Sequence, residues 1–179
     1  MSRLRLEVGH RWDGRPLPPD ARAVVQVRGL EGDDEVVVDV VAPFVNDPAP
    51  LAPPGPVDQL WEYEVVELFV VGHDGAYTEL ELGPWGHHLL LQLSGVRQVV
   101  ARGLPVVFEA RRAGDRWAGR ARVERALFPP RPVSVNAYRI HGVGAARRYE
   151  AHAPVPGEAP DFHRLGCFRP LGGGSPTTG

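Results

Sequence analysis

The chain has 179 residues, 43% of them hydrophobic, and its 20 basic and 22 acidic residues leave a net charge of −2. This length fits one domain with its own core, and the near-neutral charge excludes a global positive field that would attract nucleic acid or an anionic membrane. No apolar run approaches the roughly 18 residues that a membrane-spanning helix needs, so a soluble protein is expected.

Short stretches with the alternating pattern of a β-strand recur along most of the chain. Turn signals such as Gly72-His73-Asp74-Gly75 separate them. Repeated short strands with this spacing predict an all-β fold, an antiparallel, jelly-roll-like β-sandwich with few or no helices. The expected strands are Leu4 to Val8, Ala23 to Val27, Glu35 to Val41, Glu64 to Val71, Ala76 to Leu82, His88 to Ser94, Val106 to Ala110, Arg116 to Val123, Val133 to Ile140 and Arg148 to His152.

Three segments depart from this rhythm. Glu124 to Phe128, closed by Pro129-Pro130, predicts a single helical turn between strands. Residues 42–59 form a proline-rich loop, for which we expect an ordered start and a looser middle. The glycine-rich residues 172–179 predict a flexible tail, so that residues 1–171 form the single sandwich domain.

The N-terminus, Met1 to Val8, lacks the basic stretch and apolar block of a secretory signal. The single cysteine, Cys167, cannot form an internal disulfide and excludes a thiolate zinc cage. A cytoplasmic location is therefore expected. All basic residues are arginine, which excludes a Schiff-base lysine or the lysine of a P-loop.

The strand around Glu67 is the most informative stretch of the sequence. From Val65 to Val71 it is apolar on both faces except at Glu67. A carboxylate in such company must be paired, hydrogen-bonded or open to a groove. Glu67 is therefore a candidate ligand-binding residue.

The next two expected strands carry further polar candidates. Glu79 and Glu81 share one face of their strand, and His88 shares a face of the next strand with Gln92. If these polar faces adjoin that of Glu67, the four candidate side chains line one concave surface.

A later strand places Arg139 and His141 on one face. A guanidinium group can neutralise a partly buried carboxylate bidentately, so Arg139 is a plausible partner of Glu67. A purely structural ion pair between them is an equally good interpretation, because buried pairs without function are common.

Several of these stretches together resemble a known family. Leu60-Trp61-Glu62-Tyr63-Glu64-Val65-Val66-Glu67, the Gly83-Pro84-Trp85-Gly86-His87-His88 turn, Ile140-His141-Gly142 and Asp161-Phe162-His163-Arg164-Leu165 are similar to an uncharacterised family found in bacteria and vertebrates. The similarity runs from about Ala42 to Pro170 and implies no established activity.

More distantly, Leu60-Trp61 followed by Glu67-Leu68-Phe69, then Asn136 to Ile140, resembles the DOMON-like and family 9 carbohydrate-binding modules. That resemblance implies a β-sandwich in which Trp61 stacks on a sugar ring and Glu67 binds its hydroxyls. Trp85 is a candidate for a second stacking platform or for a cap on the sandwich.

The function predicted from these observations is a non-catalytic binding module for a carbohydrate or a related polyhydroxylated small molecule, without a cofactor. Its candidate ligand-binding residues are Trp61, Glu67, Glu79, Glu81, His88, Arg139 and His141, with residues 42–59 as a wall beside Trp61.

The alternative is a small cytoplasmic enzyme, metal-assisted or not, that uses the same Glu/His face. The histidines could converge on the glutamates around a metal ion, although no pair of them falls in a metal-binding motif. There is no Gly-x-Ser-x-Gly elbow, which argues against a hydrolase of that type. The oligomeric state stays open.

Overall fold

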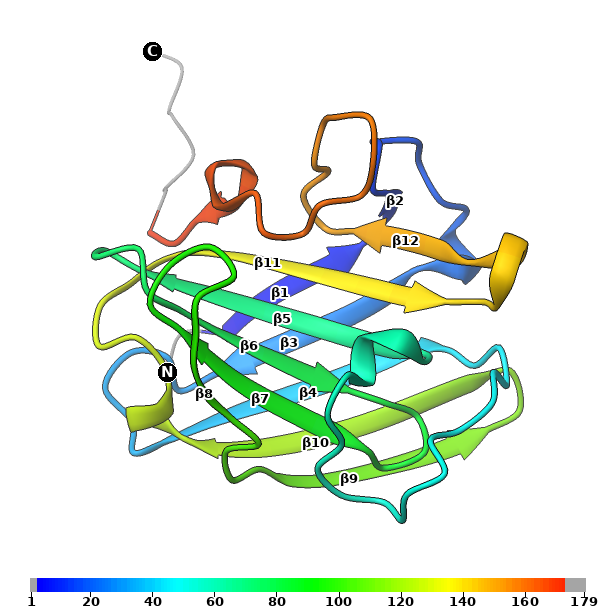
Figure 1. Ribbon diagram of the computed structural model, residues 1–179, viewed down its shortest axis with the longest axis horizontal. Coiled ribbons are helices and arrows are strands. Elements are labelled where there is room, and N and C mark those ends of the chain that lie inside the picture. Colours follow the sequence, from blue (N-terminus) through cyan, green and yellow to red (C-terminus); the bar gives the residue numbers. More distant parts are fainter. Residues whose placement is uncertain (1–2, 173–179) are drawn as a thin grey trace.

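Two antiparallel β-sheets packed face to face make up the computed structural model, which describes residues 3–172 (Figure 1). In spatial order the smaller sheet contains β1 (Arg3–Val8), β3 (Ala23–Arg28), β4 (Glu35–Pro43), β10 (Arg116–Glu124) and β9 (Val107–Ala113). In the same order the larger sheet contains β2 (His10–Arg11), β12 (Arg148–Ala151), β11 (Pro132–His141), β5 (Val65–Gly72), β6 (Tyr77–Leu82), β7 (His88–Leu93) and β8 (Val99–Arg102), with β13 (Arg169–Pro170) also paired to β11.

The helical content of residues 3–172 is limited to single 3₁₀ turns. These turns are η1 (Pro19–Ala21), η2 (Leu60–Glu62), η3 (Arg125–Leu127), η4 (Gly144–Ala146) and η5 (Leu165–Cys167). The all-β antiparallel sandwich is thereby confirmed, and η3 is the single turn expected before Pro129.

All ten expected strands are present, with ends shifted by up to three residues. The additional strands β2, β8 and β13 are two to four residues long. Strands this short contain too few alternations to give a periodic signal, which explains why the sequence does not reveal them.

The main core fills the space between the two sheets. Alternate residues of β4, such as Val36, Val38 and Val40, face Leu68 and Leu80 of the larger sheet within one buried cluster. This is the period-two pattern of strands with one face buried.

The outer face of the larger sheet is covered as well, by the chain that follows β12 and by η2 (Figure 1). Phe162 and Phe168 from this covering segment pack on Phe69 and Tyr138 of the sheet, and Leu60 of η2 belongs to the same apolar cluster. Every residue of β5 is consequently buried. Burial on both faces explains the nearly continuous apolar run from Val65 to Val71.

Residues 42–59 are connected to the rest of the fold at several points. The carboxylate of Glu64 accepts hydrogen bonds from the backbone N–H groups of Val45 and Asp47, at 3.1 and 3.4 Å. In the middle of the loop, Nε2 of His87 lies 2.8 Å from the carbonyl oxygen of Ala52. The predicted tail begins at 172, and its residues 173–179 lie outside the described part of the chain.

Within the described residues, no helix is long and apolar enough to cross a membrane.

Candidate functional site

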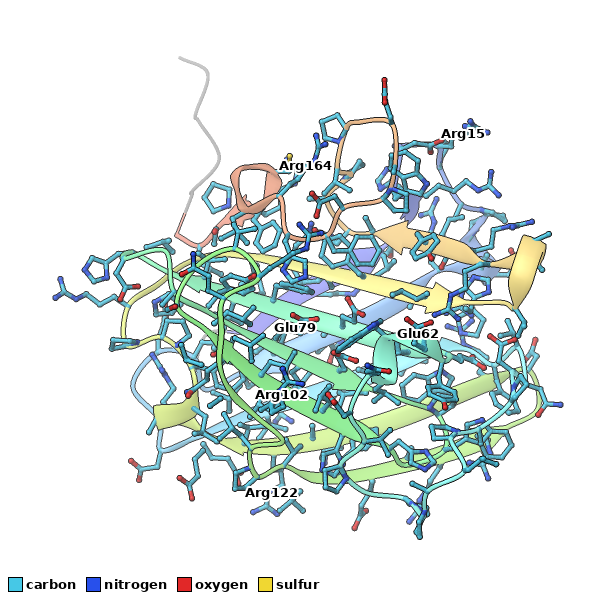
Figure 2. All side chains as sticks on the ribbon, viewed as in Figure 1. Arg15, Glu62, Glu79, Arg102, Arg122 and Arg164 are labelled. Carbon is cyan, nitrogen blue, oxygen red and sulfur yellow. The ribbon has the colours of Figure 1, made fainter. Side chains whose placement is uncertain are left out.

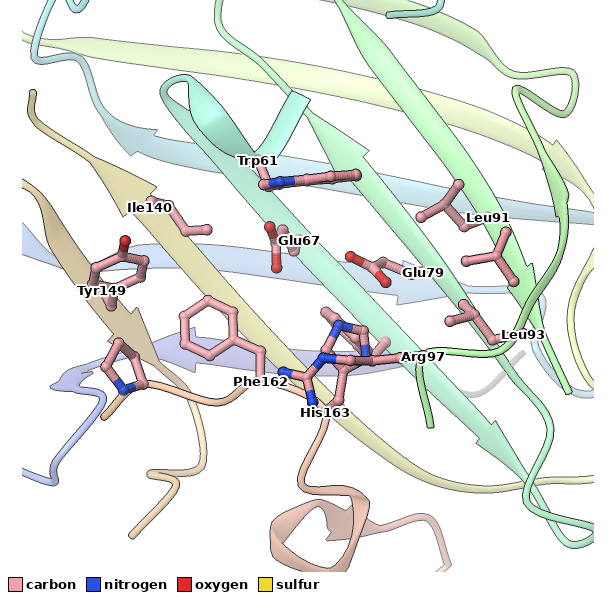
Figure 3. Close-up of a pocket in the computed structure, with 13 residues that line it drawn as sticks. Trp61, Glu67, Glu79, Leu91, Leu93, Arg97, Ile140, Tyr149, Phe162 and His163 are labelled. Carbon is pink, nitrogen blue, oxygen red and sulfur yellow. The ribbon is translucent and has the colours of Figure 1, made fainter. Parts of the chain in front are cut away.

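A pocket of about 370 Å³ opens on the outer face of the larger sheet (Figure 3). Its lining combines aromatic and aliphatic side chains with only three charged ones, Glu67, Glu79 and Arg97. The full lining is Trp61, Glu67, Phe69, Glu79, Leu91, Leu93, Arg97, Val99, Ile140, Tyr149, Pro160, Phe162 and His163. A mostly apolar concavity with a few convergent polar groups is the usual form of a small-molecule site, and this volume lies near the small end of the range.

The floor of the pocket carries two carboxylates side by side. Glu67 of β5 lies opposite Glu81 of β6 in the ladder, and Glu79 is two residues away on the same face of β6. One carboxylate oxygen from each of the three glutamates lies within 4.8 Å of the others. Figure 3 shows Glu67 and Glu79 next to the indole of Trp61, with Phe162 and His163 across the pocket.

Burial shapes the electrostatics of this cluster. Glu67, Glu79 and Glu81 are 2%, 4% and 0% exposed. Burial, then the negative charge of Glu79, raises the pKa of Glu67 well above its ordinary value. Burial is also the main cause that raises the pKa of Glu79 to about 7. For Glu81, burial and then the charges of Glu67 and Glu79 raise the pKa well above its ordinary value.

The position of these groups within the molecule contrasts with that of most arginines. In Figure 2, Glu79 lies over the middle of the larger sheet, whereas Arg15 and Arg122 lie at the edge of the molecule. Among the described residues, none of the three glutamates takes part in a salt bridge. Positive charges act on these groups only at a distance. Arg147 lowers the pKa of Glu67 and Arg97 lowers that of Glu79, each by less than burial raises it.

Trp61 is positioned by its backbone. It lies in η2, directly before β5, and its carbonyl oxygen accepts a hydrogen bond from Nη2 of Arg147. Nη1 of the same arginine donates to the carbonyl oxygen of Gly142 at 3.0 Å. Arg147 therefore ties the turn that carries Trp61 to the loop after β11.

The opposite wall is fixed by polar contacts between distant segments. The hydroxyl of Tyr77 lies 2.6 Å from Nδ1 of His163, and Nη2 of Arg97 lies 2.8 Å from Oδ1 of Asp161. Burial, followed by the charge of Arg97, lowers the pKa of His163 to about 4. These contacts fasten the segment around Phe162 to β6 and to the loop before β8.

Three of the seven candidate residues thus meet here directly, Trp61, Glu67 and Glu79, and Glu81 lies beside the two glutamates. The remaining three candidates do not join them.

His88 lies on the other face of the larger sheet, contrary to expectation. Its ring faces Phe108 of the smaller sheet, with centroids 6.1 Å apart. Leu91 and Leu93 face the pocket in its place. The alternation along β7 is as predicted, but the apolar face of this strand, and not its polar face, adjoins the glutamates.

Arg139 is not the partner of Glu67, and this prediction was wrong. The ladder between β11 and β5 places the two residues on opposite faces of the sheet. Arg139 is 2% exposed, its Nη1 lies 3.0 Å from Oε2 of Glu150, and its Nη2 donates to the carbonyl oxygen of Pro43. His141 contacts the same carboxylate, with Nε2 2.9 Å from Oε1 of Glu150. The group is a buried ion-pair network outside the pocket.

One further expectation about the pocket fails, and the structure decides between the two roles considered for Trp85. None of residues 42–59, all of which the structure describes, belongs to its lining. Trp85 is also elsewhere: its Nε1 donates to the carbonyl oxygen of Asp47, its ring contacts Phe44 edge-on, and Arg112 lies 4.0 Å from its ring centre. Trp85 thus closes one end of the sandwich.

The histidines do not converge on the glutamates. Among the described residues, the one group of three potential metal ligands consists of glutamates alone. His163 lines the pocket, but its Nδ1 is already engaged by Tyr77.

Sequence reasoning missed several residues that complete the pocket, chiefly Arg97, Tyr149 and Phe162. Phe162 and His163 belong to a stretch that already stood out by resemblance, so a signal for them existed. Arg97 lies in a loop with a positive φ of 57°, and no sequence pattern marks it.

No protein-family model matches the sequence. Among curated proteins, the human UPF0462 protein C4orf33 is 42% identical over 175 residues, covering 93% of this chain and 86% of the human protein. Its zebrafish (Danio rerio) homologue is 42% identical over 171 residues, covering 90% and 85%.

Among solved structures, one neighbour is a protein from Bacteroides uniformis described as a "putative carbohydrate-binding protein". It superposes with a TM-score of 0.68 at 16% identity, covering 94% of this chain and 84% of that one. At this identity the likeness shows the shared fold alone.

Proposed function

The chain belongs to the UPF0462 family, and from that premise we propose that it is a non-catalytic binding module for a carbohydrate or a related polyhydroxylated small molecule. The observation that carries the proposal is the pocket in which the indole of Trp61 adjoins the carboxylates of Glu67 and Glu79. The description of the Bacteroides uniformis protein and the resemblance to DOMON-like and family 9 modules support the same class of ligand.

The chemistry of the lining suits such a ligand. An indole or phenyl ring covers the apolar C–H face of a pyranose, while carboxylates and a guanidinium group bind its hydroxyls. Trp61, Tyr149 and Phe162 supply the rings, and Glu67, Glu79 and Arg97 supply the polar groups. The small volume favours a ligand of one or two sugar rings over a long chain.

Calorimetry against a panel of neutral, acidic and amino sugars tests the proposal. We expect saturable binding of at least one sugar, which Trp61→Leu and Glu67→Gln weaken at least about tenfold, equivalent to 1.4 kcal/mol. Trp85→Leu is the matched control, because Trp85 lies outside the pocket, and it should keep the affinity. Folded Trp61→Leu protein that binds as well as the parent would refute the assignment.

A second candidate is a small enzyme that uses the same carboxylates. The pKa of Glu79, raised to about 7 by burial, would let it exchange a proton near neutral pH, as a general acid or base does. Incubation with a panel of chromogenic glycosides would reveal such activity, and its loss in Glu79→Gln would assign it to this pocket. Turnover would exclude a purely binding role.

A cytoplasmic location and the absence of nucleic-acid partners belong to the same proposal. Fractionation of cells that express the chain with a small epitope tag would test the location.

A further inference from the structure

The three pocket-floor glutamates, Glu67, Glu79 and Glu81, form a cluster that the sugar-binding proposal alone does not explain. They come from two neighbouring strands, project from the same face and bring one oxygen each within 4.8 Å of the others. Hydroxyl recognition needs one or two carboxylates at the surface of a pocket, whereas Glu81 is fully buried behind the other two and is not part of the lining.

Glu81 supplies a second, independent observation. Both of its carboxylate oxygens are buried and, within the described part of the chain, no N–H or hydroxyl donor reaches them; its side-chain contact is with the carboxyl group of Glu79. A buried ionised carboxylate without compensation costs several kcal/mol or more, so such a group keeps a proton or meets a donor or a cation. When the cluster is ionised, Glu81 therefore lacks a positive partner.

No positive side chain takes that place. Arg147 and Arg97 are engaged by the carbonyl oxygen of Trp61 and by Asp161, respectively. Arg139 is on the opposite face of the sheet and is paired with Glu150. The partner must then enter from solvent, and the pocket provides the route, because Glu67 and Glu79 line it.

We propose that Glu67, Glu79 and Glu81 bind one divalent cation of the calcium class at the floor of the pocket. Three carboxylates offer the all-oxygen ligand set that such hard cations prefer. Zinc sites of the usual kind would need histidine or cysteine ligands, and the cluster contains none.

The ligand set favours Ca²⁺ over Mg²⁺, because Mg²⁺ usually binds through one or two carboxylates and keeps several waters. Two oxygens on opposite sides of a Ca²⁺ ion lie up to about 5.2 Å apart, against about 4.2 Å for Mg²⁺, from their usual metal–oxygen distances. The oxygens of the cluster all lie within 4.8 Å of one another, inside the span that Ca²⁺ allows. Ca²⁺ also accepts six to eight ligands, so positions remain open toward the pocket.

Those open positions give the cation a role that rests on the proposed function. Paired hydroxyls of a bound sugar can replace water on the ion, which ties ligand recognition to the buried cluster. The cation site itself does not depend on the sugar, so the two can be tested separately.

The experiment is calorimetry of the full chain at about pH 8, first stripped with a chelator and then titrated with CaCl₂, MgCl₂ or MnCl₂ alone. We expect one saturable Ca²⁺ site that binds more tightly than Mg²⁺. Glu81→Gln should weaken Ca²⁺ binding at least about tenfold, because even replacing residues that only support the metal ligands commonly lowers metal affinity 10- to 100-fold. Glu109→Gln, at an exposed position of β9, removes the same charge away from the cluster and should have no effect.

The outcomes separate the two proposals. No saturable Ca²⁺ binding by the folded chain, or equal binding by the parent and Glu81→Gln, overturns the cation site. Thermal unfolding with and without CaCl₂ checks that Glu81→Gln is folded, and the cation should raise the melting temperature of the parent more than that of the variant. Intact Ca²⁺ binding without any bound sugar supports the cation site and counts against the sugar-binding function only.

Discussion

Glu81 lies in an environment very different from that of an ordinary, solvent-exposed carboxylate. Burial and the charges of Glu67 and Glu79 raise its pKa well above the ordinary value of 4.5. The folded chain therefore keeps a proton that the unfolded chain releases above that value. The resulting stabilisation is complete below about pH 4.5 and is lost as the pH rises through the raised pKa.

Glu81→Gln should remove this dependence, because an amide does not titrate. In the presence of a chelator we expect the variant to gain stability relative to the parent as the pH rises from about 5 to about 9. Urea denaturation at both pH values measures the difference. If the unfolding free energies of the variant and the parent differ by the same amount at both pH values, the assigned environment of Glu81 is contradicted.

His163 gives a pH dependence of opposite sign. Burial and the charge of Arg97 lower its pKa to about 4, from an ordinary value of 6.5. Below about pH 6.5 the His163 side chain binds a proton in the unfolded chain but stays unprotonated in the folded chain. Stability therefore falls as the pH falls from about 6.5 to about 4. His163→Asn keeps a polar group near Nδ1 for the hydroxyl of Tyr77 and cannot titrate. Its unfolding free energy should fall less steeply over this range, and an equal slope in both proteins would exclude His163 as the cause.

Among the elements, β11 and β12 are joined by the buried pair of Arg139 and Glu150. Removing one partner leaves an uncompensated buried charge, which commonly costs 3 to 5 kcal/mol. Arg139→Met should thus destabilise the fold by about 3 kcal/mol, and a second change, Glu150→Leu, should restore part of the loss. Urea denaturation of the single and double variants measures both effects. A destabilisation that simply adds would show that the pair is not coupled.

The segment after β12 should couple stability to the pocket through Phe162. Its ring stacks on Tyr138 with centroids 3.8 Å apart and is 9% exposed, and the same side chain lines the pocket. Phe162→Ala should cost about 3 kcal/mol of stability, as is usual for a buried phenylalanine, and should lower ligand affinity as well. Urea denaturation and calorimetry on the same variant measure its stability and its ligand affinity. Unchanged stability would show that the packing of this segment on the sheet does not stabilise the fold.

The strands themselves could be predicted because each carries its own period-two pattern. The face that each strand directs outward could not be predicted. β7 has one polar and one apolar face, and its own sequence does not indicate which of the two adjoins Glu67. That choice depends on the covering segment around Phe162, which buries the outer face and admits Leu91 and Leu93 there. His88 was misplaced for this reason.

The residues at the centre of the candidate site could be predicted from the sequence, whereas those at its rim could not. Glu67 and Glu79 lie on β5 and β6, where the alternation of the strands carries information, and Trp61 in η2 was indicated by the family resemblance. Arg97 and Tyr149 reach the pocket only because β8 and β12 lie on either side of the central strands β11, β5, β6 and β7. The pairing of Arg139 with Glu150 likewise depends on the ladder between β11 and β12, which the sequence of β11 alone does not specify.

For the whole molecule, the two-layer sandwich with a covered outer face explains why a small pocket exists at all. The inner core stabilises the two sheets, and the covering layer leaves an opening over β5, β6 and β7. Ligand binding should consequently stabilise the entire fold, because the pocket is built from segments that separate on unfolding. A sugar at 100 times its dissociation constant should add about 2.7 kcal/mol to the unfolding free energy. A sugar that binds in calorimetry and leaves the unfolding midpoint unchanged would have to bind elsewhere.

The central claim is that a polyhydroxylated ligand lies against Trp61 over Glu67 and Glu79. Saturation-transfer NMR on a mixture of simple sugars tests it most directly, because protons that touch aromatic side chains receive magnetisation from the protein. We expect transfer to the ring C–H protons of at least one sugar, and we expect this transfer to be lost in folded Trp61→Leu but not in Trp85→Leu. Absence of transfer to every sugar, or equal transfer in both variants, would contradict it.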